Sequence, residues 1–235
     1  RPGGWTAPSL ACALAASGIT RLWSHQRESA DLVRAGRHVA LSTGTASGKS
    51  LGYLLPLLTE LIGPTEGDEP AAGPNRMARP PTALYLSPTK PLAADQLARI
   101  ASYELPRVRA ATYDGDTPTD ERTWIRRNAN LILTNPDMLH RALLPAHARW
   151  APFWRGLRYV VVDESHTYKG VFGAHMAAVL RRLRRVAAHH GACPVFVFAS
   201  ATIADAAGHA ELLSGEPVHE VCDDGSPRAA AVFAL

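Results

Sequence analysis

The sequence has few cysteines, no long apolar run and no recognisable leader, and each absence excludes a class of protein. Its three cysteines are scattered over 235 residues without C-x-x-C spacing, so we expect neither a zinc ribbon nor a disulfide framework, and a reducing cytosol is the natural setting. Arg, His, Asp or Pro interrupts every apolar run before it reaches the length of a bilayer span. The chain starts at Arg1 without an initiator Met, so we expect its start to be trimmed. A cytoplasmic, nucleoid-associated protein with no membrane partner is the resulting expectation.

What the sequence does contain is the composition of a folded domain with a mild basic excess. Hydrophobic residues make up 46% and charged residues 20%, which favours a packed core over disorder. The length suffices for one large α/β domain or two small ones. The net charge of +4 and the pI of about 9.2 permit a polyanionic partner without establishing one.

Short β-branched runs alternate with longer helical stretches along the chain. Apolar runs such as 159–162 lack polar alternation, which is typical of strands buried on both faces of a parallel sheet. The predicted strands are His38–Thr43, Ala83–Ser87, Arg109–Tyr113, Leu131–Thr134, Tyr159–Asp163, Val195–Ala199 and Val218–Val221. The predicted helices are Ser24–Ala35, Gly48–Ile62, Pro91–Ser102, Thr119–Asn128, Pro136–Leu143, Phe172–His189 and Ala204–Leu213. This order predicts one α/β domain with a mostly parallel central sheet and helices on both faces.

Three segments lie outside this rhythm. Residues 1–20 are expected to form an N-terminal extension. Residues 63–81, rich in Pro, Gly, Ala and acidic side chains, are expected to form a mobile surface loop. Leu144–Gly156 carries two prolines and two tryptophans, which predicts a short ordered excursion. The sequence shows no internal repeat.

The sharpest local signal is a loop of small residues between a predicted strand and a predicted helix. Thr45, Ala46, Ser47 and Gly48 allow backbone N–H groups to turn around a phosphate, and the helix N-terminus adds free donors. Lys49 would neutralise phosphate charge, and the Ser50 hydroxyl would bind Mg²⁺. The strict G-x-x-x-x-G-K-[ST] pattern requires Gly at position 43, where this chain has Thr43. An ordinary loop before a helix is the competing interpretation.

Two adjacent carboxylates follow the most apolar strand. Asp163 suits Mg²⁺, and Glu164 suits a water that attacks the phosphate, because ligands bind beyond the carboxyl ends of strands in open α/β sheets. Solvated acids at a strand end are the alternative, which the phosphate loop upstream makes less favoured. Ser200 and Thr202 follow another buried strand, and their hydroxyls are expected to hydrogen-bond this acidic loop. No G-x-S-x-G elbow surrounds Ser200 or Ser165, so a serine hydrolase is excluded.

Taken in order, these motifs resemble the first motor domain of superfamily 2 helicases, a RecA-like P-loop NTPase domain. Beyond the phosphate loop, the resemblance rests on 22–26, 88–96, 113–118, 134–139, 163–166 with its DExH-type Asp-Glu-Ser-His, and 200–202. The segments 44–50, 89–93, 163–173 and 180–185 are most similar to the Hrq/YprA branch. That family tolerates the change at Thr43.

The resemblance implies further roles. Gln26 would read adenine, His166 would couple nucleotide to movement together with Ser200 and Thr202, and ATP with Mg²⁺ would be the cofactors. Members of the branch are ATP-driven 3′→5′ DNA helicases with a second RecA-like domain and a cysteine-bearing C-terminal domain. We expect both domains to lie outside this sequence, and with them the arginine finger. A 235-residue fragment should therefore hydrolyse ATP weakly.

The resemblance also implies a nucleic-acid face. Thr89, Thr117 and Thr134 follow strands, where hydroxyls and free N–H groups suit phosphates, and Lys90 adds positive charge beside them. Gly115 lies in the same motif as Thr117. We expect backbone contacts to single-stranded or tailed DNA; simple helix capping by threonine is the alternative.

Three functions remain open at the level of sequence. The first is the ATP-binding domain of a 3′→5′ DNA helicase or translocase, with a role in DNA repair. The second is a DExH-type RNA helicase domain, and the third is a nucleotide-dependent binding scaffold. The histidines outside these motifs, His189 and His190 among them, show no ligand spacing such as H-E-x-x-H and are interpreted as ordinary surface or core residues.

Overall fold

The fold is described from a computed structural model, which defines residues 4–44, 47–64 and 80–227. The strands are β1 (Val39–Ser42), β2 (Thr82–Leu86), β3 (Ala110–Thr112), β4 (Leu131–Thr134), β5 (Leu157–Val162), β6 (Val195–Ser200) and β7 (His219–Val221). The α-helices are α1 (Pro8–Ala16), α2 (Ser24–Arg34), α3 (Ser50–Ile62), α4 (Lys90–Ala101), α5 (Thr119–Asn128), α6 (Pro136–Met138), α7 (Ala151–Gly156), α8 (Gly170–His189) and α9 (Ala206–Ser214). A π-helical turn η1 (Leu139–Leu143) and two 3₁₀ turns, η2 (His147–Trp150) and η3 (Ser165–Thr167), complete the described elements.

The strands form one seven-stranded sheet in the order β3-β4-β2-β5-β6-β1-β7. Every neighbouring pair is parallel, so the carboxyl ends of all strands meet along one edge. This confirms the predicted parallel α/β architecture. β5 and β6 lie near the middle, which explains why their sequences are apolar without alternation.

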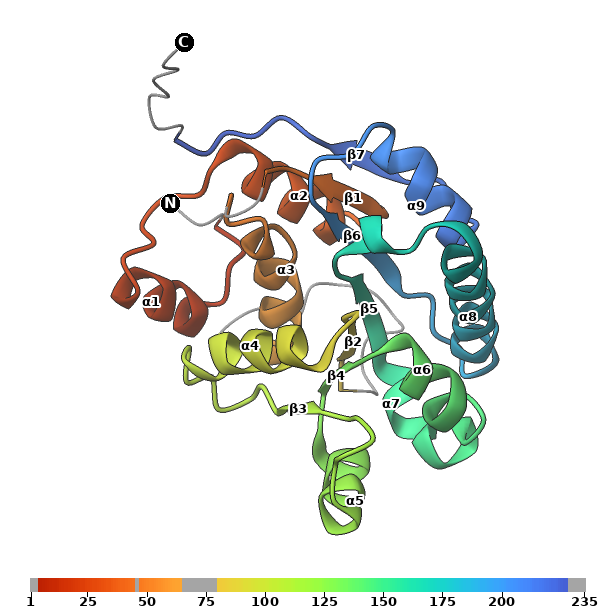
Figure 1. Ribbon diagram of the computed structural model, residues 1–235. Coiled ribbons are helices and arrows are strands. Elements are labelled where there is room, and N and C mark those ends of the chain that lie inside the picture. The colour runs from red at the N-terminus through yellow and green to blue at the C-terminus, as the bar shows by residue number, and fades with distance from the viewer. Residues whose placement is uncertain (1–3, 45–46, 65–79, 228–235) are drawn as a thin grey trace.

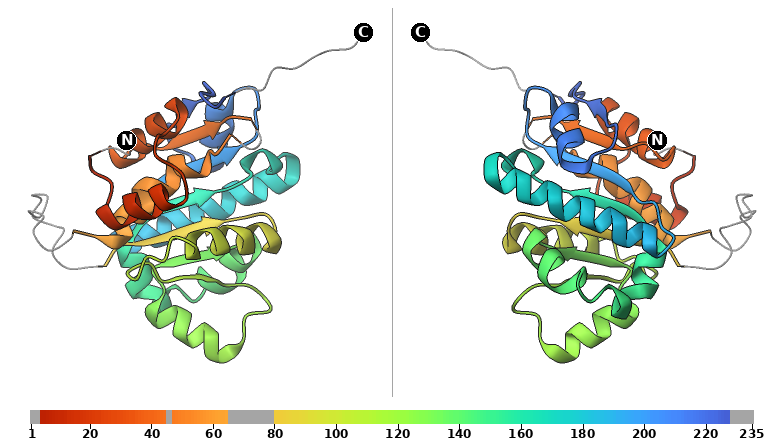
Figure 2. Two further views of the ribbon diagram at one scale, coloured as in Figure 1. Left: turned by 90° about the vertical axis from the view of Figure 1, so that its left-hand side faces the viewer. Right: turned by 90° about the vertical axis from the view of Figure 1, so that its right-hand side faces the viewer.

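Alternate residues of each central strand enter separate cores on the two faces of the sheet. In β5, Val160 and Val162 belong to one core, while Tyr159 and Val161 belong to the other. The first core is covered by α7, α8 and α9, and the second by α1, α2, α3 and α4 (Figure 1). Figure 2 shows the two faces in turn, with α1 and α4 in front in one view and α8 with α9 in front in the other.

The N-terminal extension contains a helix, α1, that was not predicted from the sequence. Pro8 sits in the first turn of α1, where its missing N–H costs nothing, and Leu10 and Leu14 are buried one turn apart against the α3 side of the sheet. The extension is therefore partly core. The expected helix at 136–143 becomes α6 followed by the π-helical turn η1.

The predicted excursion between β4 and β5 is ordered as expected. Trp150 and Trp154 are buried there, and Phe153 packs edge-on against both. Most of the expected mobile loop, residues 65–79, lies outside the described residues.

The three cysteines Cys12, Cys193 and Cys222 are free and exposed. Among the helices that the structure describes, none combines the length and the hydropathy that a bilayer crossing requires.

Candidate nucleotide-binding site and nucleic-acid face

Three neighbouring strands carry the predicted nucleotide motifs to one place on the sheet edge. β1 pairs with β6 so that Ser42 faces Ser200, and β6 pairs with β5 so that Phe198 faces Val162. The phosphate loop, the acidic pair and the Ser200 segment therefore leave the same edge side by side. The topology thus brings together residues that lie about 110 and 150 positions apart in the sequence.

Lys49 extends from the start of α3 across this edge. Its Nζ donates hydrogen bonds to the carbonyl of Thr43 at 3.2 Å and to that of Ser200 at 2.8 Å. Burial lowers the pKa of Lys49, and the negative charges of Glu164 and Asp163 partly oppose this shift. The lysine and the two acids therefore lie close enough for their charges to attract one another, as the sequence motifs require.

The loop before Lys49 is held by its own side chains. Thr43 Oγ1 and Ser47 Oγ lie 2.6 Å apart and are buried. The Thr43 side chain, which stands where the strict pattern has glycine, therefore forms a hydrogen bond within the loop. Gly48 adopts φ +66°, a conformation that side chains disfavour. Ser50 is the first residue of α3. Thr45 and Ala46 lie outside the described residues.

Gln26 is buried, and its side-chain amide is hydrogen-bonded to this loop. Its Nε2 donates to the carbonyl of Gly48 at 2.9 Å, and its Oε1 accepts from the backbone N–H of Trp23 at 3.0 Å. An amide has two N–H bonds and two lone pairs on oxygen, so one of each remains for a ligand. The placement suits the predicted adenine contact and adds a second task, which is to fix Gly48.

The acidic pair is partly buried, and its second residue has an unusual backbone conformation. Burial raises the pKa of Asp163, although a hydrogen bond from the Tyr85 hydroxyl to its Oδ2 opposes the rise. Glu164 lies in the left-handed region at φ +49°, which is uncommon for a residue with a side chain and typical of functional sites. Its Oε2 lies 3.3 Å from Nδ1 of His166.

Two buried tyrosines lie close to the residues expected to bind Mg²⁺. Tyr85 donates a hydrogen bond to Asp163, and the Tyr53 ring packs against Tyr85 with 6.3 Å between centroids. Burial raises the pKa of each phenol and keeps it protonated. Sequence reasoning missed this tyrosine pair, because a Tyr within an apolar strand or helix gives no signal beyond packing.

The Ser200 segment contacts the acidic loop differently from the expectation. The N–H of Ala201 donates to His166 Nδ1 at 3.3 Å, whereas the Ser200 hydroxyl donates to the carbonyl of Ala201 at 2.7 Å. The Thr202 side chain is exposed. Backbone rather than hydroxyl groups thus make the link, because the strand turns sharply at Ala201 and points its N–H at His166.

A segment after β7 also reaches the phosphate loop and was not predicted. The N–H of Gly225 donates to His25 Nδ1 at 3.2 Å, and His25 Nε2 lies 3.0 Å from the carbonyl of Ser47. A hydrogen bond with Ser226 lowers the pKa of Asp224 most, and His25 and the N–H of Gly44 lower it further. The buried His25 therefore bridges the loop and the end of the described chain. Only its position beside Gln26 hinted at this in the sequence.

The residues predicted to contact nucleic acid lie on the same edge over the other half of the sheet. Thr89 and Lys90 follow β2 and are exposed, and the Thr89 hydroxyl makes no capping bond to the described first turn of α4. Gly115 is exposed after β3, while the buried Thr117 hydroxyl accepts from the Asp114 N–H at 2.9 Å. Lys90 pairs with Asp116.

Thr134 is the exception within this group. It is buried at the end of β4, and its hydroxyl donates to the carbonyl of Tyr113 at 2.5 Å. That hydroxyl holds β4 to the segment after β3, so it is already engaged. A nucleic-acid role for Thr134 stays a prediction, as do the roles of the other four residues.

A phosphate loop and a carboxylate pair at the carboxyl edge of a wholly parallel sheet define a RecA-like nucleotide-binding domain. The chain belongs to the DEAD/DEAH box helicase family, whose pattern matches residues 23–209.

Two relatives and one solved structure locate the chain more closely within that family. It is 42% identical over 221 residues to the ATP-dependent helicase YprA of Bacillus subtilis, covering 93% of this chain and 28% of that protein. It is 42% identical over 203 residues to the ATP-dependent helicase hrq1 of Schizosaccharomyces pombe, covering 84% and 18%. A crystal structure of the helicase MrfA bound to DNA and AMPPNP superposes with a TM-score of 0.86 at 39% identity, covering 97% and 30%. The chain thus spans under a third of each relative, and the predicted Hrq/YprA branch is confirmed.

Proposed function

We propose that this chain is the ATP-binding motor domain of a 3′→5′ DNA helicase or translocase that acts in DNA repair. The observation that carries the proposal is the convergence of Lys49 with Asp163 and Glu164 at one sheet edge. The similarity to YprA and hrq1, both named ATP-dependent helicases, and to MrfA bound to DNA and AMPPNP supports it. The activity belongs to a longer protein of which this domain is one part.

The residues at the edge fit a magnesium-bound triphosphate. Ser50 and Asp163 offer the hard oxygen donors that Mg²⁺ prefers, and the partly buried carboxylate of Asp163 lacks a compensating cation in direct contact among the described residues. When bound, Mg²⁺ supplies neutralisation of the phosphate charge. The hydrogen bond from Tyr85 holds the Asp163 carboxylate in place, which limits the reorganisation needed on binding.

The remaining side chains divide the work of binding and proton transfer. Lys49 leaves its two backbone carbonyl partners and neutralises the terminal phosphates. Gly48 and the start of α3 offer backbone N–H groups to the phosphates, and Gln26 contacts the adenine edge while it holds Gly48. Glu164 orients the attacking water and accepts its proton, and its left-handed backbone directs the carboxylate for this task.

Coupling to movement runs through the contact between His166 and the Ser200 segment. A shift of Glu164 moves His166, which is 3.3 Å away, and His166 is hydrogen-bonded to the N–H of Ala201. The carbonyl of Ser200 in turn binds Lys49, so this segment senses both sides of the nucleotide. A second RecA-like domain supplies the arginine that completes hydrolysis.

DNA binds across the carboxyl ends of β2, β3 and β4. Thr89, Gly115 and Thr117 present backbone and hydroxyl groups to phosphates, Lys90 adds charge, and the end of β4 at Thr134 completes the edge. Contacts of this kind bind the strand backbone and carry little sequence preference.

The decisive experiment uses a full-length protein that carries this domain. We expect DNA-stimulated ATP hydrolysis and unwinding of 3′-tailed DNA, with Glu164→Gln lowering hydrolysis at least a hundredfold while nucleotide binding persists. Matched DNA and RNA duplexes with 3′ or 5′ tails test substrate and polarity. Preference for RNA favours an RNA helicase, and hydrolysis unchanged by Glu164→Gln favours a nucleotide-dependent scaffold; either result refutes the proposal.

A further inference from the structure

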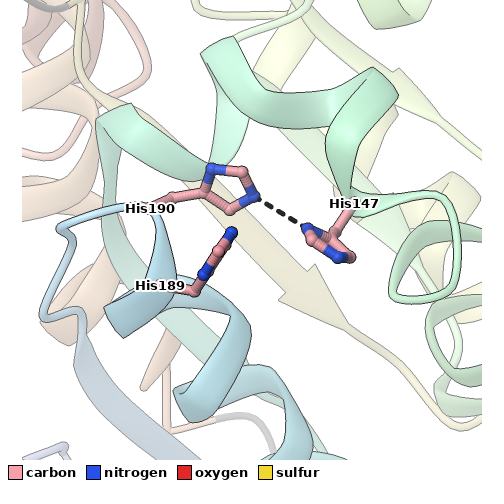
Figure 3. Close-up of side chains that lie close together, drawn as sticks. All are labelled: His147, His189 and His190. Carbon is pink, nitrogen blue, oxygen red and sulfur yellow. Dashed lines mark hydrogen bonds between the residues drawn. The ribbon is translucent and has the colours of Figure 1, made fainter.

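Three histidines gather at a place that the nucleotide and nucleic-acid sites do not use. His147 opens η2, His189 ends α8, and His190 follows it directly. One ring nitrogen from each lies within 4.8 Å of the other two. The three rings are turned toward a common centre, as Figure 3 shows, and each pair meets at a steep angle rather than stacked.

The spacing of these nitrogens is close to that of a metal site. His147 Nδ1 and His190 Nε2 are 3.0 Å apart. Two nitrogens bound to one tetrahedral zinc ion, each at about 2.0–2.1 Å, lie about 3.3 Å apart. The pair is therefore near the required separation already, and the His189 nitrogen, which lies within 4.8 Å of both, has to move closer to become the third ligand. His189 is exposed, so its ring is free to turn.

The surroundings add one favourable and one unfavourable charge. The last carbonyl groups of α8 carry the negative end of the helix dipole, which stabilises a cation beside His189 and His190. The guanidinium of Arg155 acts on His190 as well and opposes a cation there. Imidazole nitrogen is a preferred ligand of Zn²⁺ and other transition-metal dications, whereas hard ions such as Mg²⁺ prefer oxygen, so the donor set favours the former.

The cluster is remote from the proposed Mg²⁺ ligands. α8 starts seven residues after Asp163 and runs for 20 residues, which separates its two ends by roughly 30 Å at 1.5 Å per residue. The histidines thus lie toward the amino edge of the sheet, opposite the nucleotide. Their all-nitrogen donor set also differs from the oxygen donors at Ser50 and Asp163.

We propose that His147, His189 and His190 bind a transition-metal dication, Zn²⁺ in the first place, with water in the fourth position. The ion fastens the excursion between β4 and β5, which carries His147, to the carboxyl end of α8. The ion has a structural role that is independent of ATP. The metal-site proposal therefore holds even if the proposed helicase activity is refuted.

The test uses this 235-residue chain without a polyhistidine tag, stripped of metal by chelation. We expect it to bind one Zn²⁺ per chain, and Co²⁺ in its place to give the intense visible absorption of tetrahedral nitrogen coordination. His147→Ala and His190→Ala should each lower Zn²⁺ affinity at least tenfold and remove the rise in Tm that Zn²⁺ gives the parent chain. His175→Ala, on the exposed face of the same helix, and Cys193→Ser are the matched controls and should bind as the parent does.

Several results would overturn the proposal. Equal Zn²⁺ affinity in the parent and in both histidine variants would do so, as would loss of binding in Cys193→Ser. If the alanine variants fail to fold, X-ray absorption of the zinc-loaded parent decides alone. A shell of four nitrogen or oxygen ligands with the outer-shell scattering of about three imidazole rings supports the site, whereas sulfur ligands, absent imidazole scattering, or no retained zinc refute it.

Discussion

Adding one methyl group at Gly48 should either destabilise the folded chain, if the phosphate loop keeps its shape, or weaken nucleotide binding, if the loop changes shape. The Cβ of Ala at this position would lie 2.8 Å from Gln26 Nε2 and 3.0 Å from Trp23 Cζ3, at a backbone φ of +66°. The left-handed conformation costs a residue with a side chain about 1–2 kcal/mol. Displacing the Gln26 amide from the Gly48 carbonyl costs about 0.5–1.5 kcal/mol more. The free energy of unfolding should therefore fall by about 1.5–3.5 kcal/mol in Gly48→Ala, if the loop keeps its shape.

Thermal or urea unfolding measures that fall, and a Tm decrease of roughly 3–14 °C is expected for a domain of this size. Gly36→Ala is the matched control, since Gly36 has φ +80° and nothing within 4 Å of the added Cβ. It shares the backbone cost without the clash, so the difference between the two variants isolates the Gln26 and Trp23 contacts. Should the loop instead relax, stability is spared and ATP affinity is lost, measured by titration with a fluorescent nucleotide. A Gly48→Ala chain as stable as Gly36→Ala and with unchanged ATP affinity would refute the reasoning.

Three further predictions concern residues at the carboxyl edge. Asp163→Asn should stabilise the nucleotide-free chain by about 0.5–2 kcal/mol in urea unfolding, because burial raises the pKa of Asp163 and its charge is unfavourable. The stability of the parent should accordingly decline as pH rises through that folded-state pKa, and a parent and variant with the same pH profile would contradict this. Gln26→Ala should lower ATP affinity by about 1–3 kcal/mol, roughly 5- to 150-fold, and GTP affinity by less; equal losses for both nucleotides would leave Gln26 no part in reading adenine. Asp116→Asn should release Lys90 and strengthen single-stranded DNA binding, measured by anisotropy titrations. The slope of log K against log salt concentration should become steeper by about 0.7 per added phosphate contact. Asp120→Asn is the control, and an unchanged slope in Asp116→Asn would exclude Lys90 from the contact.

The order of elements could be read from the sequence because each element obeys one simple pattern. The run 159–162 is apolar throughout, which predicts a strand covered on both faces, and β5 is such a strand. Once the strands are parallel, Lys49 and Asp163 must leave the same edge. The approximate place of the nucleotide motifs therefore follows from topology alone.

The finer structure depends on contacts that sequence pattern does not encode. Tyr85 is an ordinary strand residue by propensity, yet its hydroxyl reaches Asp163 because β2 and β5 are neighbours. The three histidines show the same limit, since His147 and His190 are 43 residues apart and meet only when α8 returns beside η2. Linear ligand motifs detect sites built on one element, whereas this cluster is built on two.

The phosphate loop is held by the Thr43–Ser47 hydrogen bond within it and by two side chains at the start of α2. Gln26 binds the Gly48 carbonyl, and His25 lies against the carbonyl of Ser47 and accepts from Gly225 near the end of the described chain. Adjacent residues at the start of α2 thus hold two consecutive carbonyl groups of the loop. Both carbonyl groups are thus engaged by side chains of α2 and do not face a ligand as free acceptors, while the N–H of Ser47 is bonded to the carbonyl of Gly44. If the loop binds phosphate as proposed, the start of α2 contributes by holding the loop in shape before any ligand arrives.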